Sequence, residues 1–378
     1  MKNNRTFLEK LLDGAEVEWK PLGKVTDIKT GQSVSKNIIA QNPGIYPVIN
    51  SGREPLGFIN EWNTENDPIG ITTRGAGVGS ITWQEGKYFR GNLNYSVTIK
   101  SEYELNVRFL YHILLHFQKE IHNLCSFTGI PALNASELKK LEIPIPPLSV
   151  QTKIVKILDA LTALTSELTS ELTLRRKQYE YYREKLLSHD SSEYSTQKSD
   201  NVKFFHTSNI QWLHLNEIYK FQYGIGNKIP TIGGEYPVYG SNGIVGTHNE
   251  YNSENAPVIG HIGAYAGIVN WAEGKHFVTY NGIICNKIND NVNSRYAYYL
   301  LLSQNFIDKA NKASQPFISY DILNKCIVPV PPLEEQQRIV SILDKFEALT
   351  NSITEGLPLA IEQSQKRYEY YRELLLSF

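Results

Sequence analysis

Apolar residues at helical spacing mark two long segments of the chain. Between Gln151 and His189 there is neither glycine nor proline. The apolar positions step by three and four, at Ile154, Ile157, Leu161, Leu164, Leu168, Leu172, Tyr179, Tyr182 and Leu186. This spacing predicts one helix with a single apolar face. At 1.5 Å per residue the helix is about 57 Å long.

A second segment near the C-terminus follows the same pattern. Its apolar positions are Ile339, Ile342, Phe346, Leu349, Ile353, Leu357, Ile361, Tyr368, Tyr371 and Leu375. Gly356-Leu357-Pro358 interrupts it, which predicts a kink or a short break. In the first segment the tetrapeptide Leu-Thr-Ser-Glu occurs twice, at 164–167 and 168–171. An insertion of four residues is a stutter, which keeps the apolar stripe on one face.

These segments belong to an internal repeat that covers most of the chain. Residues 143–165 recur in similar form at 328–350, at a constant offset of 185, and residues 177–188 recur at 366–377, at an offset of 189. The parts in front repeat more faintly, at Trp19, Leu22, Gly31, Gly75, Trp83, Lys87 and Pro131, which match Trp212, Leu215, Gly224, Gly263, Trp271, Lys275 and Pro316. The chain is therefore predicted to consist of a globule and a long helix, followed by a second globule and a second long helix. The predicted boundaries are 1–148, 149–189, a polar linker at 190–203, 204–332 and 333–378.

Each globule reads as a mixed domain with a twisted β core. Short β-rich runs such as 79–83 and 96–99 alternate with glycine, asparagine and proline turns. A helix is predicted near the end of each globule, at 107–121 and 295–309. The expected fold class is α+β, with two such domains separated by two long helices that form an antiparallel coiled coil with pseudo-twofold symmetry. An ordinary helix within one domain is the alternative for each long segment.

Composition narrows the class of protein. With 378 residues, 41% hydrophobic and 20% charged, the chain is long enough for more than one folded domain and is not disordered throughout. Its apolar runs are shorter than a membrane span requires, so a cytoplasmic location is expected. The three cysteines have no paired spacing. A net charge of −1 gives no sign of nucleic-acid binding, which would need a local patch or a basic partner.

Catalytic motifs are missing. The glycine run 75–79 continues as a strand, whereas a dinucleotide site requires a helix there, and the match of Gly77 is Tyr265. His112 and His116 have metal-ligand spacing, but their matches are Tyr299 and Ser303. We predict that the chain is not an enzyme, and expect no catalytic, cofactor or metal residues in it.

Recognition of DNA is the interpretation of function that remains. Arginine and asparagine can bind base edges, and lysine can bind phosphates. The candidate DNA-binding residues are Arg53, Arg74, Lys87, Tyr88, Arg90, Asn92 and Asn94 in the first globule, and Asn242, His261, Tyr265, Lys275, His276, Tyr280 and Asn281 in the second. Arg74 is singled out because Gly75, which has no side chain, leaves space beside this long hydrogen-bond donor. The matching residue in the second globule is Ile262, so the repeat does not support this choice. For each single residue, an ordinary solvated loop is an equal alternative.

The chain resembles the specificity subunit of type I restriction-modification enzymes over essentially its whole length. The resemblance is carried by the duplicated blocks 145–159 and 330–344, by Tyr-Glu-Tyr-Tyr-Arg-Glu at 179–184 and 368–373, and by the tetrapeptide repeat. It implies two target-recognition domains, each reading half of a bipartite sequence in double-stranded DNA. It also implies two modification subunits and restriction subunits as partners, with S-adenosylmethionine, Mg and ATP bound by those partners. The break at Gly356 departs from an uninterrupted spacer helix.

The residues themselves fit that interpretation. Two diverged globules on two similar helices fit recognition of a DNA target in two halves. In this interpretation, the helices set the gap between the half-sites and dock the modification subunits. Tyr181 and Tyr370 fall off the apolar stripe and are candidates for contact with those subunits, or they cover the globules instead. A non-DNA scaffold or adhesion protein with two β-rich modules is the alternative function, and an enzyme acting unaided on nucleic acid is a third.

Overall fold

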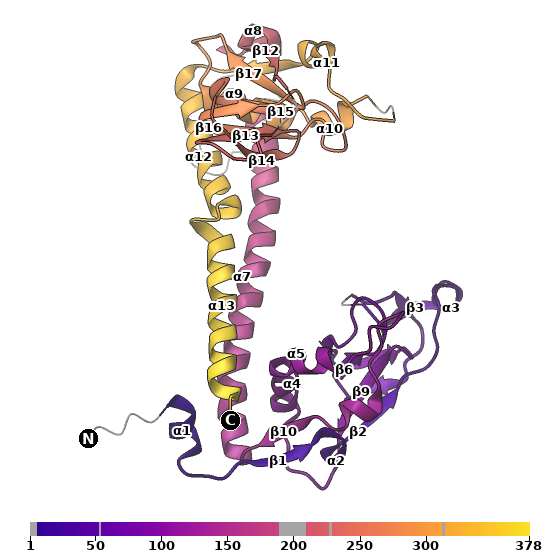
Figure 1. Ribbon diagram of the computed structural model, residues 1–378. Coiled ribbons are helices and arrows are strands. Elements are labelled where there is room, and N and C mark those ends of the chain that lie inside the picture. Colours follow the sequence, from indigo (N-terminus) through magenta and orange to yellow (C-terminus); the bar gives the residue numbers. More distant parts are fainter. Residues whose placement is uncertain (1–5, 53, 189–208, 227–228, 312–313) are drawn as a thin grey trace, which may run out of the picture. The chain divides into compact units, whose positions relative to one another are not determined.

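The computed structural model describes residues 6–52, 54–188, 209–226, 229–311 and 314–378. The predicted linker at 190–203 lies outside them. The chain divides into two compact units (Figure 1). Unit 1 is Met1–Thr169 with Ala360–Phe378, and unit 2 is Ser170–Leu359. Each unit therefore takes part of its helical portion from the other copy of the repeat.

Unit 1 contains three small sheets. A four-stranded sheet has the order β2-β9-β6-β7, a second has the order β4-β3-β8-β5, and β1 pairs with β10. The strands are β1 (Glu18–Pro21), β2 (Thr26–Thr30), β3 (Pro43–Ile49), β4 (Phe58–Ile59), β5 (Thr64–Glu65), β6 (Ile69–Thr72), β7 (Ile81–Trp83), β8 (Lys87–Arg90), β9 (Asn94–Ile99) and β10 (Glu142–Ile145). All three are short-stranded, in keeping with the frequent turns in the sequence.

Helices complete unit 1. They are α1 (Phe7–Leu12), α2 (Leu22–Val25), α3 (Lys36–Gln41), α4 (Val107–His116), α5 (Gln118–Asn123) and α6 (Ala135–Leu138), followed by the long helix α7 (Leu148–Ser188), which continues into unit 2. The main core joins α4 (Phe109, Ile113) to the start of α7 (Ile154) and the end of α13 (Leu375). The long helices are thus part of the core of the domain.

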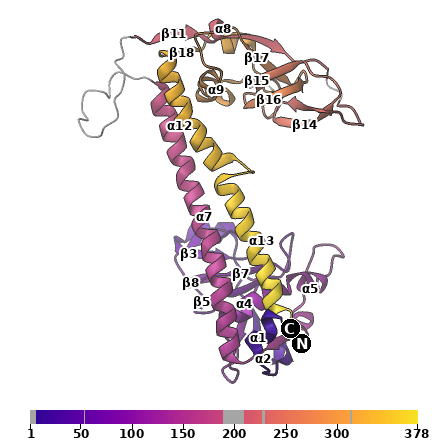
Figure 2. The same ribbon diagram turned by 90° about the vertical axis from the view of Figure 1, so that its left-hand side faces the viewer.

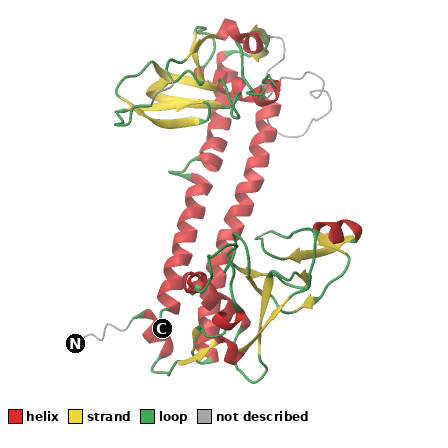
Figure 3. Cartoon of the chain, turned by 45° about the vertical axis from the view of Figure 1, so that its right-hand side comes forward, coloured by secondary structure: helices red, strands yellow, loops and turns green. Residues whose placement is uncertain are grey.

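Unit 2 repeats this plan with one larger sheet. Its order is β12-β17-β15-β16-β13-β14, and β11 pairs with β18. Figure 3 shows the strands in yellow. The strands are β11 (Gln211–His214), β12 (Tyr219–Tyr223), β13 (Tyr236–Gly240), β14 (Gly243–His248), β15 (Ser253–Gly260), β16 (Val269–Val278), β17 (Gly282–Lys287) and β18 (Ile327–Val330). The helices are α8 (Leu215–Ile218), α9 (Ser294–Ser303), α10 (Phe306–Lys309), α11 (Tyr320–Asn324), α12 (Leu333–Asn351) and α13 (Gly356–Leu376), the last of which extends into unit 1.

The long helices pair in antiparallel fashion within each unit. In unit 2, Tyr179 and Tyr182 of α7 pack on Phe346 of α12, while Arg176, which precedes them, donates to the carbonyl oxygen of Thr350, which follows Phe346. In unit 1, Thr165 of α7 and Ser364 of α13 share a hydrogen bond of 2.8 Å. The α+β fold class with paired helices is confirmed. None of the helices in the described ranges is long and apolar enough to cross a membrane.

The predicted break in the second long segment is present. α12 ends at Asn351 and α13 begins at Gly356 (Figure 2). Gly356 has a φ of +78°, and a Cβ there would lie 2.5 Å from the carbonyl oxygen of Ala348. Only glycine fits this position without strain. Pro358 falls in the first turn of α13, where its missing N–H costs no hydrogen bond.

The domain helices are shorter than predicted. The segment 107–121 divides at Phe117 into α4 and α5, and 295–309 divides at Asn305 into α9 and α10. Asn305 has a φ of +46°, a left-handed conformation that ends α9. Phe117 has a φ of −84° and a ψ of 14°, outside the helical range. Neither break contains glycine or proline, so the helical spacing of the apolar residues gave no sign of either break.

Candidate nucleic-acid interface

In unit 1, loops from distant parts of the sequence meet beside the sheets. The amide of Thr73 donates to Leu93 O (2.9 Å), the amide of Leu93 donates to Asn50 Oδ1 (2.9 Å), and the amide of Gly75 donates to Pro131 O (3.0 Å). Loop 126–132 is further joined to loop 73–79 by a bridge between Arg74 and Ala132. We call loops 50–52, 73–79, 91–93 and 126–132 rim 1.

Unit 2 builds the same framework from matching residues. The amide of His261 donates to Asn281 O (2.8 Å), and the amide of Gly263 donates to Pro316 O (2.9 Å). A bridge between Ile262 and Phe317 corresponds to the one between Arg74 and Ala132. We call loops 240–243, 261–267, 279–281 and 316–320 rim 2. Since the backbone scaffold is the same, the rims differ mainly in their side chains.

An aromatic cluster distinguishes rim 2. Tyr223 stacks on Tyr320 with ring centroids 4.3 Å apart and an interplanar angle of 13°. Tyr223 also lies 4.3 Å from the ring of His261, and Tyr280 meets His261 edge-on at 5.1 Å. By the repeat match, unit 1 has Thr30, Thr73 and Asn92 in place of Tyr223, His261 and Tyr280. Sequence analysis missed Tyr223 and Tyr320, which are far apart in the chain and carry no local signal.

Three of the candidate residues in unit 1 are accessible. Arg74, Lys87 and Asn92 are exposed. Arg74 lies in rim 1, and its side chain forms no ion pair with any residue in the described part of the chain. A free guanidinium beside a glycine with space around it can reach a ligand. Arg53 lies outside the described residues.

Three other candidates in unit 1 are corrected by the structure. Tyr88, Arg90 and Asn94 are buried. The guanidinium of Arg90 donates to the carbonyl oxygens of Ile69 (3.1 Å) and Tyr95 (3.0 Å), to Asn94 Oδ1 (2.6 Å), and to the hydroxyl of Tyr88. Burial lowers the pKa of Arg90 and raises that of Tyr88. These side chains are occupied inside the domain and do not face a ligand.

The candidates in unit 2 divide in the same way. Asn242, Tyr265, Lys275 and Tyr280 are exposed, and Asn281 is half-buried. His261 and His276 are buried, which corrects their assignment as DNA contacts. His276 Nδ1 lies 2.9 Å from the carbonyl oxygen of Gly274, and burial lowers the pKa of its ring, which favours the neutral form. Nδ1 of His261 lies 3.1 Å from the carbonyl oxygen of Tyr280, so it supports the loop that carries Tyr280.

Two exposed lysines occupy matching places in the units. Lys87 Nζ lies 4.3 Å from the ring centroid of Trp62, and Lys275 Nζ lies 4.6 Å from that of Tyr251. Both lysines follow a glycine with positive φ, Gly86 or Gly274. A lysine held against an aromatic face keeps its ammonium group directed and still solvated. Unlike the rims, this arrangement is shared by both units.

Each domain is tied to its long helices by a charged cluster. In unit 1, Arg108 of α4 donates to Asp159 of α7 (2.6 Å), and His112 Nε2 lies 2.9 Å from the same carboxylate. Burial opposes ionisation of Asp159, but the hydrogen bonds from Arg108 and His112 hold its pKa below the usual value. In unit 2, Arg295 and Tyr299 meet Asp344 in the same way.

His112 thus has a structural partner. His112 and His116 were considered as metal ligands from their spacing, but His112 is buried and its second nitrogen lies 3.3 Å from the Tyr368 hydroxyl. Within the described ranges, no group of three or more histidine, cysteine, aspartate or glutamate side chains could hold a metal ion.

The sequence and structure comparisons with known proteins all indicate the same family. A family profile described as "Type I restriction modification DNA specificity domain" matches residues 15–175 and 215–363. A putative type I restriction enzyme specificity subunit of Haemophilus influenzae is 40% identical over the full length of both chains. The EcoR124I/EcoR124II specificity subunit of Escherichia coli is 31% identical, over 99% of this chain and 97% of the relative. The crystal structure of a type I S subunit from M. genitalium shares the fold, with a TM-score of 0.65 at 23% identity, covering 96% of this chain and 97% of that one.

Proposed function

The chain belongs to the family of type I restriction-modification specificity subunits and serves in DNA target recognition, and from this premise we propose that each unit reads one half of a divided target. One observation carries the proposal. The two units share the hydrogen-bonded framework of their rims but differ in the side chains on it, with Arg74 and Asn92 on rim 1 and Tyr265 and Tyr280 on rim 2. A common scaffold with different polar and aromatic groups suits two different base sequences.

The rest of the complex supplies the chemistry in this proposal. Two modification subunits bring S-adenosylmethionine and methylate adenine, and restriction subunits that use ATP and Mg cleave DNA. This chain is non-catalytic and sets the target. The partners also provide much of the positive charge at the DNA, since this chain has a net charge of −1. Tyr181 and Tyr370 are 56% and 63% exposed, which supports their proposed role as contacts for the modification subunits.

Exchange of one domain tests the divided target. We expect that replacing residues 1–142 by the same region of a relative with a different target changes one half-site and leaves the other half and the gap unaltered. The chimera is co-expressed with its modification subunit, and adenine methylation is mapped across the genome. Cells that express the modification subunit alone serve as the control. Methylation at an unchanged motif, or at an undivided one, would contradict the proposal.

The matched lysines have a predicted role of their own. Because phosphate contacts carry no sequence information, they suit residues that both units retain. We expect Lys87→Ala and Lys275→Ala each to weaken DNA binding by the assembled methyltransferase and to reduce the salt dependence of binding by about one phosphate contact. Affinity measured over a range of salt concentrations checks this.

The exposed Lys119 provides the control for that experiment. Lys119→Ala should leave the affinity and its salt dependence unaltered. The methylated motif should be the same in all three variants. A change of motif in Lys87→Ala or Lys275→Ala would instead make that lysine a base-reading residue.

A further inference from the structure

The second long segment contains four more residues than the first. The repeat offset grows from 185 in the block 143–165 to 189 in the block 177–188, so the surplus lies between the matching blocks of the second copy. In the structure, four residues between α12 and α13, 352–355, lie outside both helices. One turn of helix contains 3.6 residues. The break is therefore as long as the surplus, which amounts to about one turn.

The apolar stripe identifies these four residues as the surplus. Leu349 and Leu357 are half-buried on either side of the break. The spacing predicts Ile353 on the stripe as well, but its side chain is 79% exposed, which corrects that prediction. Without residues 352–355, Leu349 and Leu357 would be four positions apart, which is the spacing along one face of a helix. The stripe therefore continues across the break when these four residues are left out.

The backbone at Gly356 returns to the end of α12. A Cβ on Gly356 would lie 2.5 Å from the carbonyl oxygen of Ala348 and 2.7 Å from that of Leu349. In an uninterrupted helix these oxygens would lie beside residues 352 and 353, whose amides follow four positions later. Gly356, further along the chain, lies against the same two oxygens. Figure 2 shows the connection between α12 and α13 projecting to the side of the helices, so it adds little to their length.

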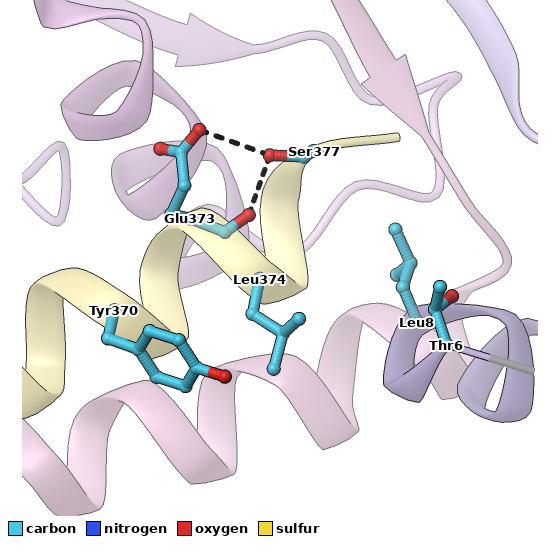
Figure 4. A pocket seen from close by; sticks show the side chains of 6 residues that line it. All are labelled: Thr6, Leu8, Tyr370, Glu373, Leu374 and Ser377. Carbon is cyan, nitrogen blue, oxygen red and sulfur yellow. Dashed lines mark hydrogen bonds between the residues drawn. The ribbon is translucent and has the colours of Figure 1, made fainter.

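Both ends of the second segment are fixed by their own domains. In unit 2, Ile339 and Leu343 of α12 are fully buried in the core. In unit 1, Leu375 at the end of α13 is fully buried, and Leu374 lines a pocket of about 360 Å³ together with Leu8 of α1 (Figure 4). A surplus turn is therefore not taken up by sliding either end of the segment past its domain.

The contacts with α7 agree with this interpretation. Arg176 donates to the carbonyl oxygen of Thr350 in unit 2, and the hydroxyls of Thr165 and Ser364 share a hydrogen bond in unit 1. From 165 to 176 α7 advances by 11 residues, whereas the second segment takes 14 from 350 to 364. Paired helices of equal length contain equal numbers of residues. The second segment thus has nearly one turn too many, and the break removes it from the paired length.

We propose that residues 352–355 form a compensating loop, which takes up the length by which the second segment exceeds α7 and keeps it out of the gap between the two half-sites. This inference rests on the proposed function, in which the paired helices set that gap. α7 is uninterrupted and continues from unit 1 into unit 2, so it fixes the length that the second segment must match. A loop in solvent gains or loses residues at little cost.

Changing the length of the compensating loop tests its role. One variant lacks residues 352–355 and has Gly356→Glu and Pro358→Thr, the residues of the first copy at 167 and 169, which permit an unbroken helix. A second variant has Gly-Ser-Gly-Ser inserted after Ile353. Each is co-expressed with its modification subunit, and adenine methylation is mapped across the genome. We expect the wild-type gap and both wild-type half-sites in each variant. An altered gap in either one would overturn the compensating loop.

Deleting Leu168–Glu171 from α7 is the matched control for these variants. It removes as many residues as the first variant does, but from the uninterrupted helix, so the gap should shrink. The compensating loop must then take up four more residues of the second segment. If this deletion and the loop deletion shorten the gap equally, the two segments contribute alike and the inference is overturned.

A disulfide cross-link gives a readout that is independent of methylation. The hydroxyls of Thr165 and Ser364 are 2.8 Å apart, so Thr165→Cys with Ser364→Cys should cross-link in the purified chain on oxidation. The cross-link should persist in both loop variants, because four uncompensated residues would move Ser364 by about 6 Å along α7. Electrophoresis without reductant detects it, and Ser364→Cys alone is the control.

The two readouts separate the loop from the function on which it rests. Loss of the cross-link in either loop variant, or its absence at the wild-type length, overturns the compensating loop even where the methylated motif is divided. A wild-type complex that methylates an undivided motif overturns the proposed function instead, and the cross-link still shows whether the loop takes up the surplus residues.

Discussion

Deleting Leu168–Glu171 is expected to shorten the gap between the two half-sites while leaving both half-site sequences unaltered. The segment is one copy of a repeated tetrapeptide, and it lies within α7, the helix that continues from unit 1 into unit 2. Four residues remove about 6 Å of helix, against a rise of about 3.4 Å per base pair, so the gap should shrink by up to about two base pairs. Mapping adenine methylation in cells that carry the deletion measures the gap directly.

The phase of the helix provides the control. Four residues are close to one turn, so the apolar stripe beyond the deletion keeps its face. Removing only Thr169 and Ser170 rotates everything that follows by about 200° and turns Tyr179 and Tyr182 away from Phe346. We expect that shorter deletion to abolish assembly and methylation. An unaltered gap after the four-residue deletion would refute the idea that helix length sets the spacing.

The helices and the repeat were predictable because their signals are local and periodic. The observed α7 spans Leu148–Ser188, within one residue at each end of the predicted 149–189. The break before Gly356 was predictable because glycine and proline act through their own backbones. Even the antiparallel pairing followed from repetition, because the same apolar stripe occurs twice and needs a partner of equal length.

The site was much harder to predict, because exposure depends on the whole fold. Arg74 and Arg90 look alike in sequence, since each precedes a glycine in a polar turn. Arg74 is exposed, whereas Arg90 is buried at the end of β8 and donates hydrogen bonds to carbonyl oxygens of β6 and β9. Likewise the stack of Tyr223 on Tyr320 exists only because the end of β12 and the start of α11 meet in space.

Buried hydrogen bonds that are present in both units explain why the helical blocks of the repeat differ less than the rims. Gln151 is fully buried, and its Oε1 accepts from the amide of Asn106 (2.8 Å), whose own side chain caps the N-terminus of α4. Gln336 accepts in the same way from Asn293, which caps α9. The glutamine in each repeated block thus fixes the start of the helix that carries the arginine bound to Asp159 or Asp344.

Replacing either glutamine by leucine is expected to destabilise its own unit by about 3 kcal/mol. Leucine has nearly the same size but cannot form the three hydrogen bonds to the backbone. In unit 2 these bonds are to the amide of Asn293 (2.7 Å) and to the carbonyl oxygens of Asn291 (3.0 Å) and Pro331 (2.7 Å). Leaving those groups buried without partners should lower the melting temperature of the unit by roughly 6–12 °C. Scanning calorimetry measures the shift.

The neighbouring Gln337 provides a matched control for Gln336→Leu. Gln337 is exposed and undergoes the same chemical change one position along α12, so Gln337→Leu should alter stability by less than about 0.5 kcal/mol. Gln151→Leu should affect the transition of unit 1, and Gln336→Leu that of unit 2. Equal effects of Gln336→Leu and Gln337→Leu would show that the buried hydrogen bonds contribute little, and the glutamines of the repeated blocks would then need another explanation.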